Sequence, residues 1–466
     1  MVSQLLLIFK TDTGCQSAAM PNPTPPVPAR HRWKVLAAGA AANAAFSVAF
    51  SGLPMTAVLM RSAYRLDNAT LGFVLGLMSL GIAVSELPWG LLTDRWGDRP
   101  VLMVGLLTTA LALLAMAFWA APSSASVPPV AMLCGGLLLV GLLGGSVNGA
   151  SGRAVMVWFD EGERGLAMSV RQTAVPLGGA LGAVALPALV RHAGFAAAYD
   201  FVAALCLAGG WMAWAWIHEP PQVPGRAAVA ASASARPATG TNTSASVPAE
   251  GPLRDRRVWR IVMGIGLLCA PQFAVISFGT VFLRDVCRAG WTTISIAMFT
   301  MQLGAMVSRI WSGRWTDRHA NRPAYLRFCG RAAMLLFAVL AALCARRDVP
   351  TTHQPMILLL VACGICVSAW HGVAFTELAT LAGAGRVGTA LGMGNTSVFS
   401  VCFLAPLVLP HLLAWQGWPL VWAAASLCAV AGTPLIASHT VGVVDTATRR
   451  RVRVIAADHD ARCKNK

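Results

Sequence analysis

Twelve apolar runs, each about 20 residues or longer, divide this 466-residue chain and limit what it can fold into. A segment that crosses the hydrocarbon core must satisfy its own backbone hydrogen bonds, which a helix does. Only 12% of the residues are charged, compared with about a quarter in soluble proteins. We therefore predict an all-α polytopic membrane protein with twelve transmembrane helices. The predicted spans are 35–60, 71–92, 101–121, 129–152, 165–190, 195–217, 258–283, 293–313, 324–345, 355–377, 387–413 and 418–439.

An internal repeat organises these spans into two halves. Residues 90–100 read GLLTDRWGDRP, and residues 313–323, at an offset of 223, read GRWTDRHANRP. The same offset pairs Gly165 with Gly388 and Thr173 with Thr396 without a gap. Six crossings return a chain to its starting side, so the two six-helix halves are parallel repeats. That architecture is typical of transporters, with the ligand site between the halves near the bilayer midplane.

Composition and charge divide the chain further. The stretch between spans six and seven is rich in Pro, Ala, Ser and Thr and has no apolar periodicity, as expected for a flexible linker. The predicted parts are a disordered N-terminal arm at 1–34, bundles at 35–218 and 258–440, a cytoplasmic linker at 219–257 and a cytoplasmic tail at 441–466.

Most Lys and Arg residues lie in segments that are cytoplasmic if both termini are inside. We therefore attribute the net charge of +17 to the orientation of the chain in an inner (plasma) membrane, with both termini cytoplasmic, rather than to nucleic-acid binding.

The charged segment between spans two and three resembles the loop signature of the major facilitator superfamily, G-x-L-x-D-R-x-G-x-[KR]. The matching residues are Gly90, Leu92, Asp94, Arg95, Gly97 and Arg99. The second copy keeps Gly313, Asp317 and Arg318 but has lost the second glycine. The resemblance implies the twelve-helix fold of that family and a latch that stabilises one state of two rocking halves.

The chemistry of this segment suits a gate. Gly90 and Gly97 allow helices and backbone to approach closely, and Asp94 is expected to face an Arg of its own loop or the positive N-terminus of a neighbouring helix. The alternative is that the charges only fix topology. Arg153 ends span four, where family members often carry an Arg linked to the motif Asp and to proton coupling; a plain cytoplasmic anchor is the other interpretation.

Charged residues inside the spans are candidates for function because a charge at mid-bilayer costs about 2.5–3.5 kcal/mol. Glu86 and Arg309 are equivalent in the repeat, each eight residues before its motif Asp. They are predicted to approach one another, to act separately as proton carrier and anion anchor, or to pair with neighbours. Arg171 either binds an anionic group or extends its guanidinium back to the cytoplasm.

Uncharged polar and aromatic residues on the cavity-lining helices of this family complete the candidate substrate site. Asn148 corresponds in the repeat to His371. The other candidates are Asn43, Ser47, Gln172, Gln272, Trp370 and Asn395.

These features predict a secondary active transporter that moves a small solute, an organic anion in the main interpretation, by proton-coupled alternating access. A drug/proton antiporter and a non-transporting membrane sensor remain alternatives. The sequence has neither a Walker A motif nor a cluster with metal-ligand spacing, so no enzyme activity, cofactor or metal is expected. The expected partners are a small-molecule substrate, protons and the lipid bilayer, and the expected state is a monomer.

Overall fold

The computed structural model describes residues 30–123, 126–218, 251–346, 354–383 and 385–437. Residues 1–29 of the predicted arm, residues 219–250 of the predicted linker and the predicted tail lie outside these ranges. Every regular element in the described part is helical. Eleven helical stretches there are long and apolar enough to cross a membrane.

The elements of the first half are α1 (His31–Gly52), η1 (Leu53–Thr56), α2 (Ala57–Ala63), α3 (Asn68–Trp96), α4 (Asp98–Ala115), η2 (Met116–Ala120), α5 (Val130–Gly144), α6 (Ser146–Trp158), α7 (Arg164–Gln172) and α8 (Ala174–Trp216). The elements of the second half are α10 (Arg256–Asp285), α11 (Trp291–His319), α12 (Arg322–Ala345), α13 (Gln354–Ala369), α14 (His371–Ala382), α15 (Val387–Gln416) and α16 (Trp418–Ile436). Several helices extend beyond the predicted apolar spans because polar ends continue the helix outside the hydrocarbon region.

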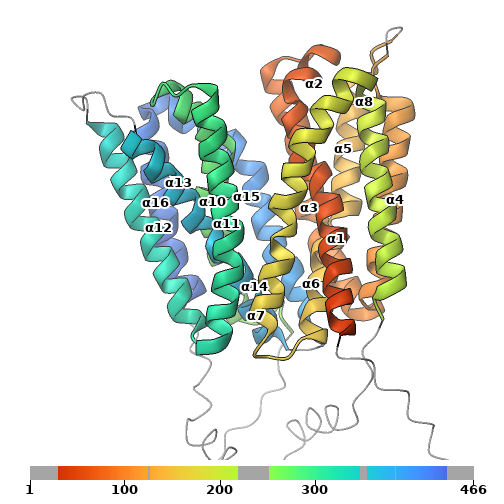
Figure 1. The fold of residues 1–466 in the computed structure, drawn as a ribbon, viewed down its shortest axis with the longest axis vertical. Helices are drawn as coiled ribbons and strands as arrows, with labels where there is room; N and C mark the ends of the chain where they lie inside the picture. Colours follow the sequence, from red (N-terminus) through yellow and green to blue (C-terminus); the bar gives the residue numbers. More distant parts are fainter. Residues whose placement is uncertain (1–29, 124–125, 219–250, 347–353, 384, 438–466) are drawn as a thin grey trace, which may run out of the picture.

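The difference between eleven stretches and twelve predicted spans arises in α8. The stretch Arg164–Trp216 has 53 residues, or about 80 Å at 1.5 Å per residue, which is far longer than one crossing. Gly194 interrupts it with a φ of 81°, a left-handed conformation that glycine adopts without strain. Figure 1 shows the chain reverse direction within α8. This stretch therefore contains two crossings, and the predicted fold class is confirmed.

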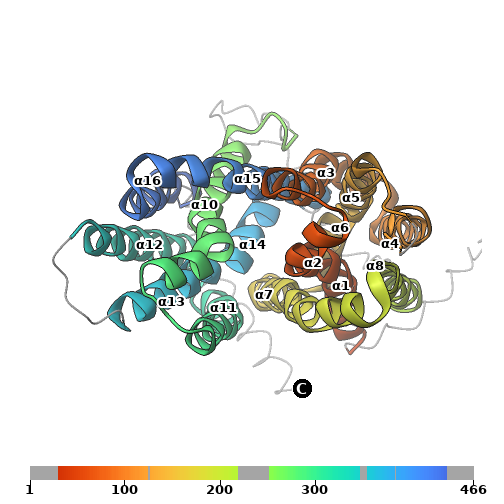
Figure 2. The ribbon, with the colours of Figure 1, turned by 90° about the horizontal axis from the view of Figure 1, so that it is seen from above.

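The two halves form separate bundles that stand side by side (Figure 2). Each half has its own buried apolar core, one centred on residues of α1 to α8 and the other on residues of α10 to α16. At the junction, α3 and α6 pack against α15, and α11 and α14 pack against α7. The junction therefore consists of two symmetry-related groups of helices, as a parallel repeat requires.

The halves are in contact at one end of the molecule and diverge towards the other (Figure 1). The end in contact carries Asp94 and Asp317, and we call it the Asp94/Asp317 end. The contacts continue along α3 and α15 past Ser79, whose hydroxyl lies 3.5 Å from the Cys402 thiol. Ser79 is 17 residues before Trp96, so this contact lies about 25 Å from the end of α3.

Candidate functional site

Asp94 lies on the last turns of α3 rather than in a loop, and it caps a helix of the other half. Its Oδ1 accepts a hydrogen bond from the Gly388 amide at 2.7 Å. Its Oδ2 accepts from the Thr389 amide at 2.7 Å and from the Thr389 hydroxyl at 2.6 Å. Because α15 begins at Val387, the carboxylate satisfies free amides at a helix N-terminus and meets its partial positive charge.

Asp317 makes the equivalent contact from the second half. Its carboxylate accepts from the amides of Gly165 at 3.0 Å and Leu166 at 2.7 Å, at the start of α7. The loss of the second glycine does not prevent this contact, because Ala320 takes that position with a φ of 50°. The repeat therefore provides two carboxylate caps, each joining one half to the other.

Glycines make the close approach at both caps possible. A Cβ atom added to Gly90 would lie 2.4 Å from the Gly388 carbonyl oxygen, and one added to Gly313 would lie 2.4 Å from the Gly165 carbonyl oxygen. Gly97 has a φ of 85° and is the single residue between α3 and α4. The predicted roles of these glycines in close packing and in the turn agree with this geometry.

Arginines surround the two caps from different positions in the two halves. Arg153 forms an ion pair with Asp98 at 3.0 Å and lies 3.6 Å from Asp94. In the second half, Arg322 lies 3.4 Å from Asp317. The other three arginines of the predicted gate lie away from the carboxylates. The Arg99 guanidinium lies 5.9 Å from the centre of the Trp214 ring, and Arg95 and Arg318 are exposed.

Glu86 is fully buried in α3, with 0% of its surface exposed. Its Oε1 accepts a hydrogen bond from the Asn148 side-chain amide at 2.6 Å, within the first half. Its Oε2 accepts from the Asn395 side-chain amide at 3.2 Å, from α15 of the second half. The carboxyl group therefore lies at the junction and is bonded to both halves.

Arg171 is buried and donates to residues of the first half, so the alternative in which its guanidinium extends to the cytoplasm is not observed in this conformation. Its Nε donates to the Ser151 hydroxyl at 2.8 Å, and its Nη2 donates to the Asn148 carbonyl at 2.6 Å. Asn148 thus connects Arg171 to Glu86, and the two charges are close enough to interact electrostatically. Among the described residues, Asn148 is the residue that contacts both, through its side-chain amide to Glu86 and its carbonyl to Arg171.

Arg309 is buried in α11, and its hydrogen-bond partners among the described residues are backbone carbonyls. Its Nε donates to the Ser368 carbonyl at 2.8 Å, and its Nη1 donates to the Gln172 carbonyl of the first half at 2.8 Å. Within the described ranges, no carboxylate lies within 4.0 Å of this guanidinium. The predicted approach of Arg309 to Glu86 is therefore not observed in this conformation.

The two charged contacts at the junction follow the repeat. Glu86 and Arg309 are separated by 223 positions in the sequence, as are their partners Gln172 and Asn395. Each charged residue contacts the partner from the opposite half, through α3–α15 in one case and through α11–α7 in the other. An acid and a base thus occupy equivalent sites with opposite charge.

The remaining candidates of the second half gather near Arg309. The Gln272 side-chain amide donates to the Ser368 hydroxyl at 3.2 Å, and His371 lies 3.7 Å from the Cys269 thiol. The Trp370 and His371 rings stack at 4.1 Å, where α13 breaks into α14. Ser368 was missed by the sequence analysis because serine is common in spans. Its position three residues before His371, within the same predicted span, was the available signal.

Asn43 and Ser47 lie apart from these contacts, on α1. Both are buried, and the Asn43 amide has no hydrogen-bond partner among the described residues. Ser47 packs against the helix that carries Gly178, where an added Cβ would lie 2.7 Å from the Ser47 Cβ. The structure does not connect either residue with Glu86 or Arg309.

A comparison with protein-family models matches residues 37–406 to the Major Facilitator Superfamily. This range includes both charged motifs and every candidate site residue described above.

Similar proteins support the same relationship. An uncharacterized MFS-type transporter of Mycobacterium tuberculosis strain H37Rv is 28% identical over 429 residues, covering 91% of this chain and 89% of that protein. The uncharacterized transporter YybO of Bacillus subtilis is 25% identical over 174 residues, 36% of this chain and 37% of YybO. The solved structure of the proton:xylose symporter XylE matches with a TM-score of 0.68 at 12% identity, covering 86% of this chain and 94% of that one. The last match concerns the fold alone.

Proposed function

The chain belongs to the major facilitator superfamily of secondary transporters, and we propose that it moves a small organic anion by proton-coupled alternating access. The observation that carries the proposal is the buried guanidinium of Arg309, which has only carbonyl partners in the described part of the chain. A buried cation without a counter-ion is unfavourable unless a ligand supplies the charge. A carboxylate or phosphate accepts two parallel hydrogen bonds from guanidinium, so an anion is the matching substrate class.

Glu86 is proposed as the proton site. As a carboxylate it accepts hydrogen bonds from both Asn148 and Asn395. On protonation, one oxygen becomes a donor and a weaker acceptor for an amide N–H. The longer bond, from Asn395, is the one expected to break, and it joins the two halves. Proton binding would therefore loosen the junction, which couples the proton to the conformational change.

Arg171 is proposed to support this proton site rather than to bind substrate directly. Its guanidinium N–H groups donate hydrogen bonds to Ser151, Asn148 and Met168 within the first half. Its positive charge offsets part of the cost of burying an ionised carboxyl at Glu86. Gln272, Trp370 and His371, which lie near Arg309, are proposed to contact the uncharged part of the substrate.

The test is transport into proteoliposomes containing the full chain, with a panel of labelled organic anions, neutral solutes and cationic drugs at two pH values. Arg309→Gln removes the charge and keeps hydrogen-bonding capacity, and we expect KM for the transported anion to rise about tenfold or more, the loss of a charge-assisted bond. Arg260→Gln, an exposed position on α10, serves as the control.

Transport of cationic drugs instead of anions would contradict the proposal and favour the antiporter alternative. Binding of a solute without flux would favour the sensor alternative. An unchanged KM in Arg309→Gln, with normal protein levels in the vesicles, would remove Arg309 from the substrate site.

A further inference from the structure

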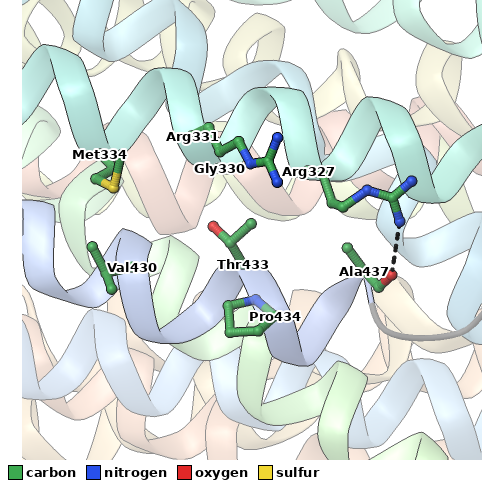
Figure 3. Close-up of a pocket in the computed structure, with 8 residues that line it drawn as sticks. All are labelled: Arg327, Gly330, Arg331, Met334, Val430, Thr433, Pro434 and Ala437. Carbon is green, nitrogen blue, oxygen red and sulfur yellow. Dashed lines mark hydrogen bonds between the residues drawn. The ribbon is translucent and has the colours of Figure 1, made fainter.

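A cavity lies outside the junction, between the peripheral helices α12 and α16 (Figure 3). Its volume is about 390 Å³, within the range of ligand-binding pockets. One side is lined by residues of α12, namely Arg327, Gly330, Arg331 and Met334. The other side is lined by Val430, Thr433, Pro434 and Ala437. None of these residues takes part in the contacts between the two halves described above.

The positions of Arg327 and Arg331 allow both guanidinium groups to bind one ligand. They are four residues apart, so they lie on the same face of α12. Helical side chains tilt towards the N-terminus, which for α12 is the Asp94/Asp317 end of the molecule. Figure 3 shows both guanidinium groups over the gap between the two helices. Arg327 also donates to the Ala437 carbonyl at 3.3 Å, which fixes its position at the end of α16.

The depth of the cavity matches the region of lipid headgroups. Arg327 and Arg331 are five and nine residues after the first residue of α12, about 7 and 13 Å along the helix. The 24 residues of α12 measure about 36 Å, compared with a hydrocarbon core of about 30 Å. The guanidinium groups, tilted towards the helix start, therefore lie near the boundary between headgroups and acyl chains.

The surroundings of the cavity face lipid. Phe328 and Leu335 of α12 are 69% and 58% exposed, and Leu427 and Val430 of α16 are 67% and 48% exposed. Large apolar side chains at this exposure, on helices that span a membrane, contact acyl chains. Basic pockets between transmembrane helices bind anionic lipid headgroups. A ligand in this cavity therefore needs a negative headgroup and an apolar tail.

We propose that this cavity binds the phosphate headgroup of an anionic glycerophospholipid in the leaflet at the Asp94/Asp317 end. Arg327 and Arg331 bind the phosphate, and Met334, Val430 and Pro434 contact the part of the acyl chain next to the glycerol. The lipid would bridge α12 and α16.

The test uses the purified full chain in detergent and measures binding by native mass spectrometry and thermal unfolding. The probes are dioctanoyl phosphatidylglycerol, dioctanoyl phosphatidylcholine and inorganic phosphate. We expect phosphatidylglycerol to bind and to raise Tm, with an affinity about tenfold weaker in Arg327→Gln/Arg331→Gln because charge-assisted hydrogen bonds are lost. Arg260→Gln is the matched control, since it removes one exposed arginine from α10 and leaves the cavity intact.

Two further variants keep the result interpretable if the double variant does not fold. Arg331→Gln alone changes an exposed side chain and should still weaken binding. Val430→Trp fills the cavity without changing the charge and should also weaken binding. Equal affinity in wild type and the arginine variants would overturn the proposal. Equal binding of phosphatidylcholine would overturn the requirement for a negative headgroup, and equal binding of inorganic phosphate would show a free-anion site instead of a lipid site.

Discussion

Glu86 shows how one side chain can connect chemistry with movement. Its two oxygens accept hydrogen bonds from amides of opposite halves, Asn148 and Asn395. Its repeat equivalent Arg309 instead donates to the Gln172 carbonyl across the same junction. A carboxyl changes its hydrogen-bonding capacity when it gains a proton, whereas guanidinium stays charged. At the residue scale, the two equivalent positions are therefore suited to different tasks.

The first residue-scale prediction concerns Glu86→Gln. Glutamine has nearly the same shape but cannot ionise, so uptake driven by a pH gradient should fall to background while exchange of substrate between the two sides continues. Proteoliposomes with and without an imposed pH gradient measure both activities. Glu377→Gln, a buried carboxyl near Arg322, is the control. Gradient-driven uptake that survives in Glu86→Gln would exclude Glu86 as the proton carrier.

The second residue-scale prediction concerns Gly90→Ala. The added methyl group would lie 2.4 Å from the Gly388 carbonyl oxygen of the other half, so the closed contact must open. Overpacking of this kind costs about 1–3 kcal/mol, enough to shift the population of states about 5- to 150-fold. Gly72→Ala is a control on the same helix, because nothing lies within 4 Å of its added Cβ.

Labelling of a cysteine introduced at the Asp94/Asp317 end measures the shift. The labelling rate should rise in Gly90→Ala and stay unchanged in Gly72→Ala. Equal rates in the two variants would mean that the contact between α3 and α15 does not hold the halves closed.

At the scale of elements, the closed end depends on two helix N-termini, those of α15 and α7. Each is capped by a carboxylate from the opposite half, Asp94 or Asp317. A hydrogen bond to a charged group contributes about 1.5–3 kcal/mol. Asp94→Asn and Asp317→Asn should each favour the state open at this end, and the double variant should favour it more than either change alone.

Distances between spin labels at Trp96 and His319, on α3 and α11 in a cysteine-free background, measure this opening. Asp200→Asn, an exposed position on α8, should leave the distance distribution unchanged. A double variant with the wild-type distribution would show that the caps fix topology only, which was the alternative interpretation of the sequence.

At the scale of the whole molecule, transport requires the halves to separate where they now touch. The Ser79 hydroxyl lies 3.5 Å from the Cys402 thiol of the other half. Ser79→Cys should therefore form a disulfide with the native Cys402 on oxidation, which would stop transport until a reductant is added. With a protease site inserted between residues 219 and 250, the cleaved halves should stay together on a non-reducing gel.

Ser79→Cys combined with Cys402→Ala is the control, and oxidation should not affect its transport. Full transport by the oxidised Ser79→Cys chain, with the crosslink demonstrated on the gel, would contradict a mechanism in which α3 and α15 move apart.

The sequence by itself determined the helical membrane fold, the two parallel halves and the equivalence of their residues. Length and hydropathy of each span are local properties, and the offset of 223 aligned Asp94 with Asp317 and Glu86 with Arg309. The cost of a charge in hydrocarbon also identified Glu86, Arg171 and Arg309 as residues that need partners. Those inferences require no knowledge of how the halves meet.

Only the tertiary structure decided which partners those residues have. Arg309 donates to the backbone carbonyls of Gln172 and Ser368, and carbonyls are present at every residue, so no sequence pattern marks them. Arg171 turned inward because Ser151 and Asn148 accept its hydrogen bonds. The contacts that close the junction join residues more than 100 positions apart, and their geometry depends on how two complete bundles pack.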